Sequence, residues 1–304
     1  MSDSGGVGRV VAGIEGGGTT FKCAAGRDPL DPDLETTIPT TDPETTLTAV
    51  ADFLRDAESR LGPIDGIGVA MFGPIEIRPT NEHCGRIGRT PKLEWREANV
   101  LEPLRAWTDT TIRLDTDVNG AALAESVHGA GSDVESIIYI TIGTGIGGSY
   151  VSGGRVPPAL VHPEMGHISV RRPPNDEFAG VCPIHGDCWE GLASGTALAA
   201  RNGLTGAEMT VDQLAAAVAH EGRDLGAGIA ELALSTAPHR FVLGGGVAQM
   251  TGLLDAVRMH VATALDAYPG VAAHQSPDYI VTSRLDGRAG IIGAMMLGVE
   301  AALS

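Results

Sequence analysis

Residues 10–24 of the chain read VVAGIEGGGTTFKCA, and residues 137–151 read IIYITIGTGIGGSYV. Each stretch passes from an apolar segment of strand type through a glycine turn into a second strand segment. The two stretches share this pattern, although their likeness in sequence is weak. Such a repeat predicts two related domains that face each other across a cleft, which is a usual place for a ligand.

Strand patterns alternate with helical patterns along the rest of the chain, which is typical of an α/β architecture. We predict strands at residues 9–15, 19–25, 67–72, 111–114, 137–142, 147–151, 240–243 and 279–282. We predict helices at 43–61, 118–129, 195–202, 211–220, 225–236, 253–267 and from 290 to the end, with loops at 27–43 and 73–93. The expected division is a small N-terminal domain, residues 1–116 plus 290–304, and a larger domain, residues 117–289.

Composition and charge limit the kinds of partner that this chain is expected to have. The 304 residues carry a formal net charge of −17 and only two lysines, Lys22 and Lys92. The absence of a basic stripe argues against a nucleic-acid partner. No apolar run has the length of a membrane span and no signal peptide opens the chain, so we expect no membrane partner and a cytoplasmic location. Cys23 and Cys84 stand alone and are predicted to be buried thiols.

A cluster of thiol and imidazole side chains follows the second glycine turn. The segment CPIHGDC places Cys182, His185 and Cys188 at Cys-x2-His-x2-Cys spacing, and His167 lies just upstream. Zinc prefers these ligand types, and a closed structural site takes four of them in a tetrahedron. In a reducing compartment, clustered cysteines favour ligation over a disulfide. The sequence therefore predicts a structural zinc site that fixes a loop.

Three glycine turns follow apolar strands. Gly17 and Gly18 precede Thr19 and Thr20 in the first turn, and the second contains Thr144 and Gly145. Glycines let consecutive N–H groups point at phosphate oxygens, and threonine hydroxyls add donors. The third turn, with Gly244, Gly245 and Gly246, precedes a helix and is suited to pass against a flat base. The alternative for the first two is a plain hairpin turn, and none matches a P-loop or dinucleotide fingerprint.

Carboxylates accompany these features. Asp117 either caps the helix that follows it or acts as a general base on an attacking hydroxyl, and Asp115 is the rival candidate. Glu164 and Glu190 flank the predicted zinc segment, where they would accept hydrogen bonds from hydroxyl groups of a ligand. Glu15 precedes the first glycine turn and would orient a magnesium ion near phosphates.

These segments together resemble the ROK sugar kinases, and most closely their bacterial fructokinase branch. The likeness runs from about Val10 to Leu297. GIEGGGTTF and TIGTGIGG look like the two phosphate loops, DTDVNGAALAE like the catalytic segment, and FVLGGGV like the adenosine loop. HPEMGHISVRR and FAGVCPIHGDCWEGLASGTA look like the sugar and zinc segment, whose Cys-x2-His-x2-Cys form is the most specific part.

The resemblance implies two ribonuclease-H-like domains of the actin-like ATPase superfamily around a central cleft. It implies phosphoryl transfer from MgATP to the 6-hydroxyl of D-fructose, with Asp117 as base. Gly73, Glu164, His167 and Glu190 would lie near the sugar. The implied nucleotide-binding residues are Gly17, Gly18, Thr19, Thr20, Thr144, Gly145, Thr196, Gly244, Gly245 and Gly246. His167 would also ligate zinc, and the family is commonly dimeric.

Departures from the family pattern leave alternatives open. The first loop usually carries Thr-Lys, whereas this chain has Thr19-Thr20. Thr20 and Lys22 are expected to point to the same face of a strand, so Lys22 would substitute in part for the usual lysine. Thr116-Asp117 replaces the Asn-Asp of glucokinase-like members, which favours fructose. Mannose, glucose or an N-acetyl amino sugar remain alternative substrates. A non-catalytic sugar-binding regulator and a zinc-stabilised interaction module are the alternatives from other classes.

Overall fold

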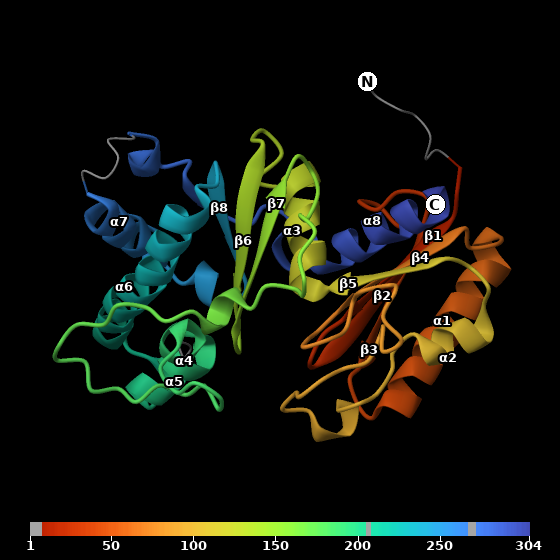
Figure 1. Ribbon diagram of the computed structural model, residues 1–304, viewed down its shortest axis with the longest axis horizontal. Coiled ribbons are helices and arrows are strands. Elements are labelled where there is room, and N and C mark those ends of the chain that lie inside the picture. Colours follow the sequence, from red (N-terminus) through yellow and green to blue (C-terminus); the bar gives the residue numbers. More distant parts are fainter. Residues whose placement is uncertain (1–7, 205–207, 267–271) are drawn as a thin grey trace. The chain divides into compact units, whose positions relative to one another are not determined.

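A computed structural model describes residues 8–204, 208–266 and 272–304 (Figure 1). The chain divides into two compact units, of which the first comprises the described residues of Met1–Ala124, Pro158–His162 and Gly287–Ser304. The second comprises those of Glu125–Pro157 and Pro163–Asp286. The division between Ala124 and Glu125 falls within a helix. It does not test the domain boundary expected at 116/117, which stays a prediction.

The first unit is built on a five-stranded sheet in the order β3-β2-β1-β4-β5. Its strands are β1 (Val11–Gly16), β2 (Thr20–Gly26), β3 (Leu34–Pro39), β4 (Gly66–Met71) and β5 (Ile112–Thr116). β1 pairs with β2 antiparallel and with β4 parallel, and β4 pairs with β5 parallel. The predicted loop at 27–43 is therefore wrong where it includes β3. This edge strand alternates between half-buried and exposed residues, so it lacks the apolar signal of a core strand.

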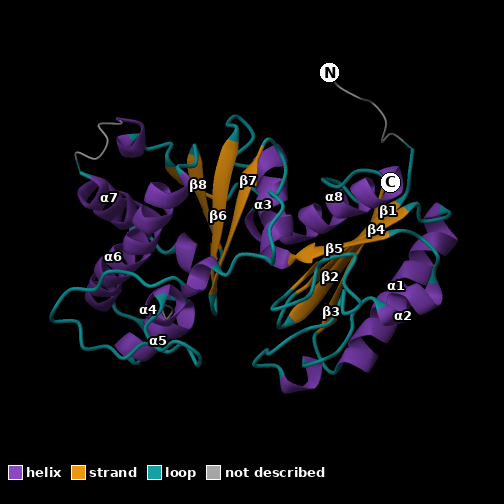
Figure 2. Ribbon diagram, viewed as in Figure 1, coloured by secondary structure: helices purple, strands orange, loops and turns teal. Residues whose placement is uncertain are grey.

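Helices cover both faces of this sheet (Figures 1 and 2). They are α1 (Pro43–Leu61), the short α2 (Glu102–Trp107) and α8 (Ala289–Leu303), with the 3₁₀ helix η1 (Leu93–Trp95). Leu47 and Leu54 of α1 share one apolar core with Ile14, whereas Met295 of α8 packs with Val11 on the opposite face. Alternate residues of β1 thus face different helices, as a strand buried on both sides requires. Helix α2 was not predicted.

Helix α8 packs unusually close to the central strands. A Cβ built on Gly68 of β4 would lie 2.0 Å from the carbonyl oxygen of Ala294 and 2.4 Å from the amide nitrogen of Gly298. We expect Gly68→Ala to lower the free energy of unfolding by about 1–3 kcal/mol, because helix or strand must move. Gly287→Ala is the matched control, since no atom lies within 4 Å of its built Cβ. Urea unfolding checks this, and equal stability of the two variants would refute the close packing.

The second unit repeats the strand arrangement of the first. Its sheet has the order β7-β6-β8-β9, with β6 (Ser136–Ile142), β7 (Ile146–Ser152), β8 (Arg240–Gly244) and β9 (Ile280–Thr282). β6 pairs antiparallel with β7 and parallel with β8, and β8 pairs parallel with β9. This matches the order and directions of β2-β1-β4-β5, so the repeat predicted from the two strand–turn–strand stretches is confirmed in topology.

The helices of the second unit are α4 (Trp189–Ala193), α5 (Gly195–Asn202), α6 (Val211–Thr236) and α7 (Leu253–Leu265). Helix α3 (Asp117–His128) begins in the first unit and ends in the second. The prediction of two helices at 211–220 and 225–236 is wrong, since α6 is continuous. The apolar pattern of α6 is interrupted at Gly222. Glycine is needed there because a Cβ would lie 2.4 Å from Ala256 Cβ of α7. Residue 267, the predicted end of α7, lies outside the described residues.

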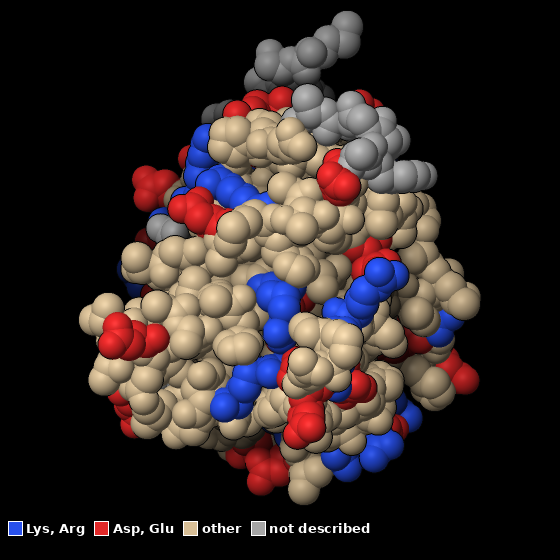
Figure 3. All heavy atoms as spheres, turned by 90° about the vertical axis from the view of Figure 1, so that its left-hand side faces the viewer, with Lys and Arg blue, Asp and Glu red and all other residues tan. Residues whose placement is uncertain are grey.

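Further short 3₁₀ helices are η2 (Met165–His167), η4 (Val247–Gln249), η5 (Ala272–Gln275) and η6 (Asp286–Arg288). Cys23 and Cys84 are buried, as predicted, and burial raises the pKa of the Cys23 thiol to about 12. Among the residues described, no helix has the length and apolar character needed to cross a membrane. The face in Figure 3 carries small groups of basic side chains next to acidic ones rather than a continuous basic surface.

Candidate functional site

The four residues predicted to bind zinc come together in the second unit. Their candidate ligand atoms all lie within 4.8 Å of one another. His167 Nδ1 is 3.4 Å from Cys188 Sγ and 3.8 Å from Cys182 Sγ, and His185 Nδ1 is 3.9 Å from Cys182 Sγ. Zinc bonds of about 2.3 Å to sulfur and about 2.0 Å to nitrogen place tetrahedral ligand atoms about 3.3–3.8 Å apart. The two thiols and two imidazoles therefore fit a closed zinc site.

A tight turn holds two of these ligands. Cys182 and Gly186 exchange backbone hydrogen bonds of 3.1 and 2.9 Å, and the N–H of His185 donates to Cys182 Sγ at 3.5 Å. Gly186 has φ +70°, which favours glycine. Desolvation by burial, reinforced by the neighbouring Cys182, raises the pKa of Cys188 to about 11. Without a metal this thiol therefore stays protonated, and a bound cation would favour its thiolate. Two thiols with two imidazoles are a donor set that suits zinc.

Ion pairs fix the rest of the zinc loop to α5. Arg172 donates to Asp187 at 2.8 Å and to the carbonyl of Phe178, while Arg201 donates to Asp176 at 2.8 Å. The guanidinium of Arg201 also lies 4.4 Å from the ring centroid of Phe178. Arg201 holds the pKa of the Asp176 carboxyl well below its usual range. These charged contacts therefore hold the segment around the candidate ligands, from Arg172 to Asp187, against α5.

Helix α4 connects the zinc loop to the second glycine turn. Trp189 is fully buried, and its indole N–H donates to the carbonyl of Asp224 in α6 at 3.0 Å. The next residue, Glu190, accepts the N–H of Ile146 with Oε2 at 3.0 Å. A Cβ built on Gly145 would lie 2.4 Å from this same oxygen, so glycine is needed there. Glu190 thus bonds directly to the second glycine turn, a contact that the sequence did not reveal.

The predicted nucleotide-binding residues of the second unit gather at one edge of its sheet. Thr196, near the start of α5, donates through Oγ1 to the carbonyl of Thr144 at 2.8 Å. The third turn, Gly244–Gly246, follows β8, which pairs with β6. Gly245 has φ +86°, and a Cβ there would lie 2.3 Å from the carbonyl oxygen of Ile142. The second turn, the third turn and the start of α5 therefore lie side by side.

The other predicted residues share an edge of the first sheet. The amide N–H of Gly17 donates to the carbonyl of Thr20 at 3.0 Å and closes the first turn. This turn follows β1, while Gly73 follows β4 and Asp117 follows β5. These three strands run parallel in register, so their carboxyl ends meet at one edge. The first turn, Gly73 and Asp117 therefore belong to a single group.

Local hydrogen bonds distinguish Asp117 from Asp115, the other candidate for the general base. Thr116 Oγ1 accepts the N–H of Asn119 at 3.2 Å, so the helix-capping contact belongs to Thr116. Asp117 begins α3 half-buried, and its Oδ1 accepts the N–H of Val118 at 2.8 Å. Asp115 Oδ1 accepts both the side-chain amide of Asn119 at 2.6 Å and the N–H of Thr116 at 2.8 Å. Desolvation raises the pKa of Asp115.

Lys22 does not turn toward the first glycine loop. Its Nζ donates to the carbonyl of Gly287 at 2.7 Å and lies 3.2 Å from Glu15 Oε2 in an ion pair. In the structure, Lys22 therefore does not take the place of the lysine that is usual in the first loop. Desolvation raises the pKa of Glu15, and Lys22 opposes this rise. The carboxylate also lies against the start of α8, where a Cβ on Gly290 would be 2.3 Å from Glu15 Oε1.

Sequence reasoning missed His162, which belongs to the first unit. Its Nε2 lies 3.7 Å from a Cβ built on Gly73, and its charge acts to lower the pKa of Asp115 against the larger effect of desolvation. The signal was present, because His162 opens the segment HPEMGH from which only Glu164 and His167 were taken. Glu164 itself is exposed and precedes η2, in which the N–H of His167 donates to its carbonyl at 3.0 Å.

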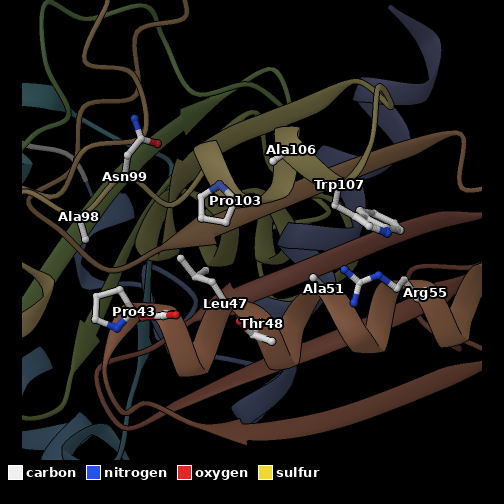
Figure 4. A pocket seen from close by; sticks show the side chains of 11 residues that line it. Pro43, Leu47, Thr48, Ala51, Arg55, Ala98, Asn99, Pro103, Ala106 and Trp107 are labelled. Carbon is white, nitrogen blue, oxygen red and sulfur yellow. The ribbon is translucent and has the colours of Figure 1, made fainter.

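A separate cavity of about 430 Å³ lies between α1 and α2 (Figure 4). Its lining includes Leu47 and Ala51 of α1 and Pro103 and Trp107 of α2. None of the predicted site residues contributes to it. It therefore has no part in the candidate site.

The chain is similar to known proteins over nearly its whole length. The family model described as "ROK family" matches residues 11–301. A putative fructokinase of Bacillus subtilis strain 168 is 37% identical over 294 residues, 96% of each chain. A fructokinase of Zymomonas mobilis is 36% identical and covers 96% of this chain and 97% of its own.

Among solved structures, a ROK hexokinase from Thermus thermophilus superposes with a TM-score of 0.77. It is 27% identical to this chain, and the match covers 95% of this chain and 97% of that one. The predicted α/β fold of the actin-like ATPase superfamily is thereby confirmed.

Proposed function

Because the chain belongs to the ROK family of sugar kinases, we propose that it is a fructokinase that phosphorylates the 6-hydroxyl of D-fructose with ATP. The observation that carries this proposal is its identity of 36–37%, over nearly the full length, with proteins named as fructokinases or putative fructokinases. Its zinc-loop spacing, Cys182-x2-His185-x2-Cys188, points to the same branch.

Asp117 is the proposed general base. Its carboxylate takes the proton from the sugar 6-hydroxyl as that oxygen attacks the γ-phosphorus, and the bond to the departing ADP oxygen breaks. Its position at the carboxyl end of β5, on the same sheet edge as the first glycine turn, supports this role. Asp115 is less suited, because Asn119 and a backbone N–H already donate to its carboxylate.

Phosphoryl transfer asks the protein mainly to position groups and to balance charge. In this proposal, the first turn (Gly17, Gly18, Thr19 and Thr20) and the second turn (Thr144 and Gly145) bind the phosphates, and Thr196 with Gly244–Gly246 lines the nucleotide. Magnesium supplied with ATP offsets phosphate charge, and Glu15 is its proposed protein partner. Gly73, Glu164, His167 and Glu190 bind the sugar.

The zinc role is structural in this proposal. His167, Cys182, His185 and Cys188 would occupy all four positions of a tetrahedral ion, so none remains for substrate. The ion then braces the loop that leads into α4 and Glu190, whose bond to Ile146 supports such a link. We also propose that the protein forms a homodimer and is located in the cytoplasm.

A coupled assay of ADP release with MgATP across a panel of hexoses tests the substrate. We expect D-fructose to give the highest kcat/KM among fructose, mannose, glucose and N-acetyl amino sugars. A different preferred sugar would replace fructose with that alternative and leave the kinase assignment intact. Sugar binding without ADP release would instead support the non-catalytic regulator. Zinc binding with neither sugar nor nucleotide binding would support the interaction module.

A further inference from the structure

The first glycine turn is held by a second segment of its own unit. Thr40 follows β3, and its N–H donates to the carbonyl of Thr19 at 2.9 Å. Its hydroxyl donates to the carbonyl of Gly17 at 2.8 Å. Thr40 therefore donates hydrogen bonds to two backbone carbonyls of the turn. This arrangement fixes its backbone before any ligand binds.

A buried tryptophan fixes the neighbouring segment at residues 90–95. Trp95 is 1% exposed, and its indole N–H donates to the carbonyl of Thr41 at 2.7 Å. Its ring stacks on Phe21 at a centroid distance of 5.4 Å and meets Phe72 edge-on at 5.5 Å. Because Thr41 adjoins Thr40, the segment that bears Trp95 and the glycine turn are bonded to consecutive residues.

Lys92 lies on this fixed segment beside the turn. Its carbonyl accepts the N–H of Trp95 at 3.0 Å, and a Cβ built on Gly18 would lie 3.3 Å from Lys92 Cε. Within the described ranges, the Lys92 ammonium group has neither a hydrogen-bond acceptor nor an ion-pair partner. The chain's other lysine, Lys22, is already paired with Glu15.

We propose that Lys92 binds a phosphate group of the nucleotide at the first glycine turn. This inference rests on the proposed function, since it assigns a residue to the phosphate end of the same site. The backbone N–H groups of such a turn are partial charges, whereas a triphosphate carries several full negative charges. A half-buried ammonium group on a segment fixed by Trp95 meets that charge with little loss of freedom on binding.

Calorimetric titration of the full chain with ATP, ADP and adenosine tests this role. We expect Lys92→Met to weaken ATP and ADP binding by about 10- to 100-fold, as for loss of a charged hydrogen bond. Adenosine has no phosphate, so its affinity should stay unchanged. Lys92→Arg should keep most of the ATP affinity, because it keeps the charge. The KM for fructose should stay within about twofold of the wild-type value.

Glu94→Gln is the matched control, because Glu94 is an exposed residue of η1, the short helix that Lys92 precedes. This variant should bind all three ligands as the wild type does. Thermal melts show whether Lys92→Met folds normally. Unchanged ATP affinity in folded Lys92→Met, or an equal loss for adenosine, would overturn the inference. A wild-type chain that binds ATP but phosphorylates no sugar refutes the proposed function alone, since the Lys92 comparison still stands.

Discussion

Asp117→Asn is expected to lower kcat by about 10²-fold or more, in line with the loss of a general base. The amide keeps the size of the carboxylate, and its carbonyl oxygen can still accept the N–H of Val118 at the start of α3. Folding, sugar affinity and ATP affinity should therefore change little. Steady-state kinetics together with calorimetric binding of fructose and ATP separate the loss of chemistry from a loss of binding.

Asp115→Asn provides the matched comparison, since Asp115 lies two residues earlier and receives its own hydrogen bonds from Asn119 and Thr116. We expect this variant to lose less than about tenfold in kcat, because Asp115 holds the start of α3 rather than the proton. The reverse ranking, with Asp117→Asn nearly fully active and Asp115→Asn inactive, would transfer the role of base to Asp115.

Cys182→Ser is expected to remove zinc from the protein and to lower both stability and activity. Cys182 Sγ lies near both His167 and His185, so its loss breaks the ligand set at the centre of the loop. Without the ion, the loop no longer fixes α4 and Glu190. Misplacement of such positioning groups by about 1 Å costs about 10²-fold in rate, which is the loss we expect in kcat/KM for fructose.

Elemental analysis and thermal melts check this prediction. Wild-type protein should carry one zinc per chain, and Cys182→Ser close to none. Cys84→Ser is the control, because Cys84 is a similarly buried thiol, 7% exposed against 6% for Cys182, outside the cluster. Freshly purified wild-type protein without zinc, or a Cys182→Ser variant that keeps one ion, would show that the cluster is not a zinc site.

Local signals in the sequence were enough for much of the fold. Helix α1 has the predicted bounds, since Asp42 caps it by accepting the N–H of Thr45 and Pro43 occupies its first position. Gly62, with φ +96°, ends it. By contrast, β3 is recognised only by its pairing with β2, and the continuity of α6 depends on its packing against α7 at Gly222. Such contacts between distant segments leave no local pattern.

The candidate site divides in the same way. Three of the four cluster residues lie within seven positions of one another, so spacing alone predicted their convergence. The bond from Ile146 to Glu190 spans 44 positions, and no local pattern announces it. Lys92 was noted only as one of two lysines, because its place beside Gly18 arises from the contacts of Trp95. Polar contacts between distant segments thus had to come from the structure.

The identity of the product tests the central claim most directly. Incubation of the purified protein with MgATP and D-fructose, followed by phosphorus and carbon NMR, reports both the nucleotide product and the phosphorylated position. We predict ADP and D-fructose 6-phosphate in equal amounts. Formation of fructose 1-phosphate, or hydrolysis of ATP with no sugar phosphate, would contradict the account.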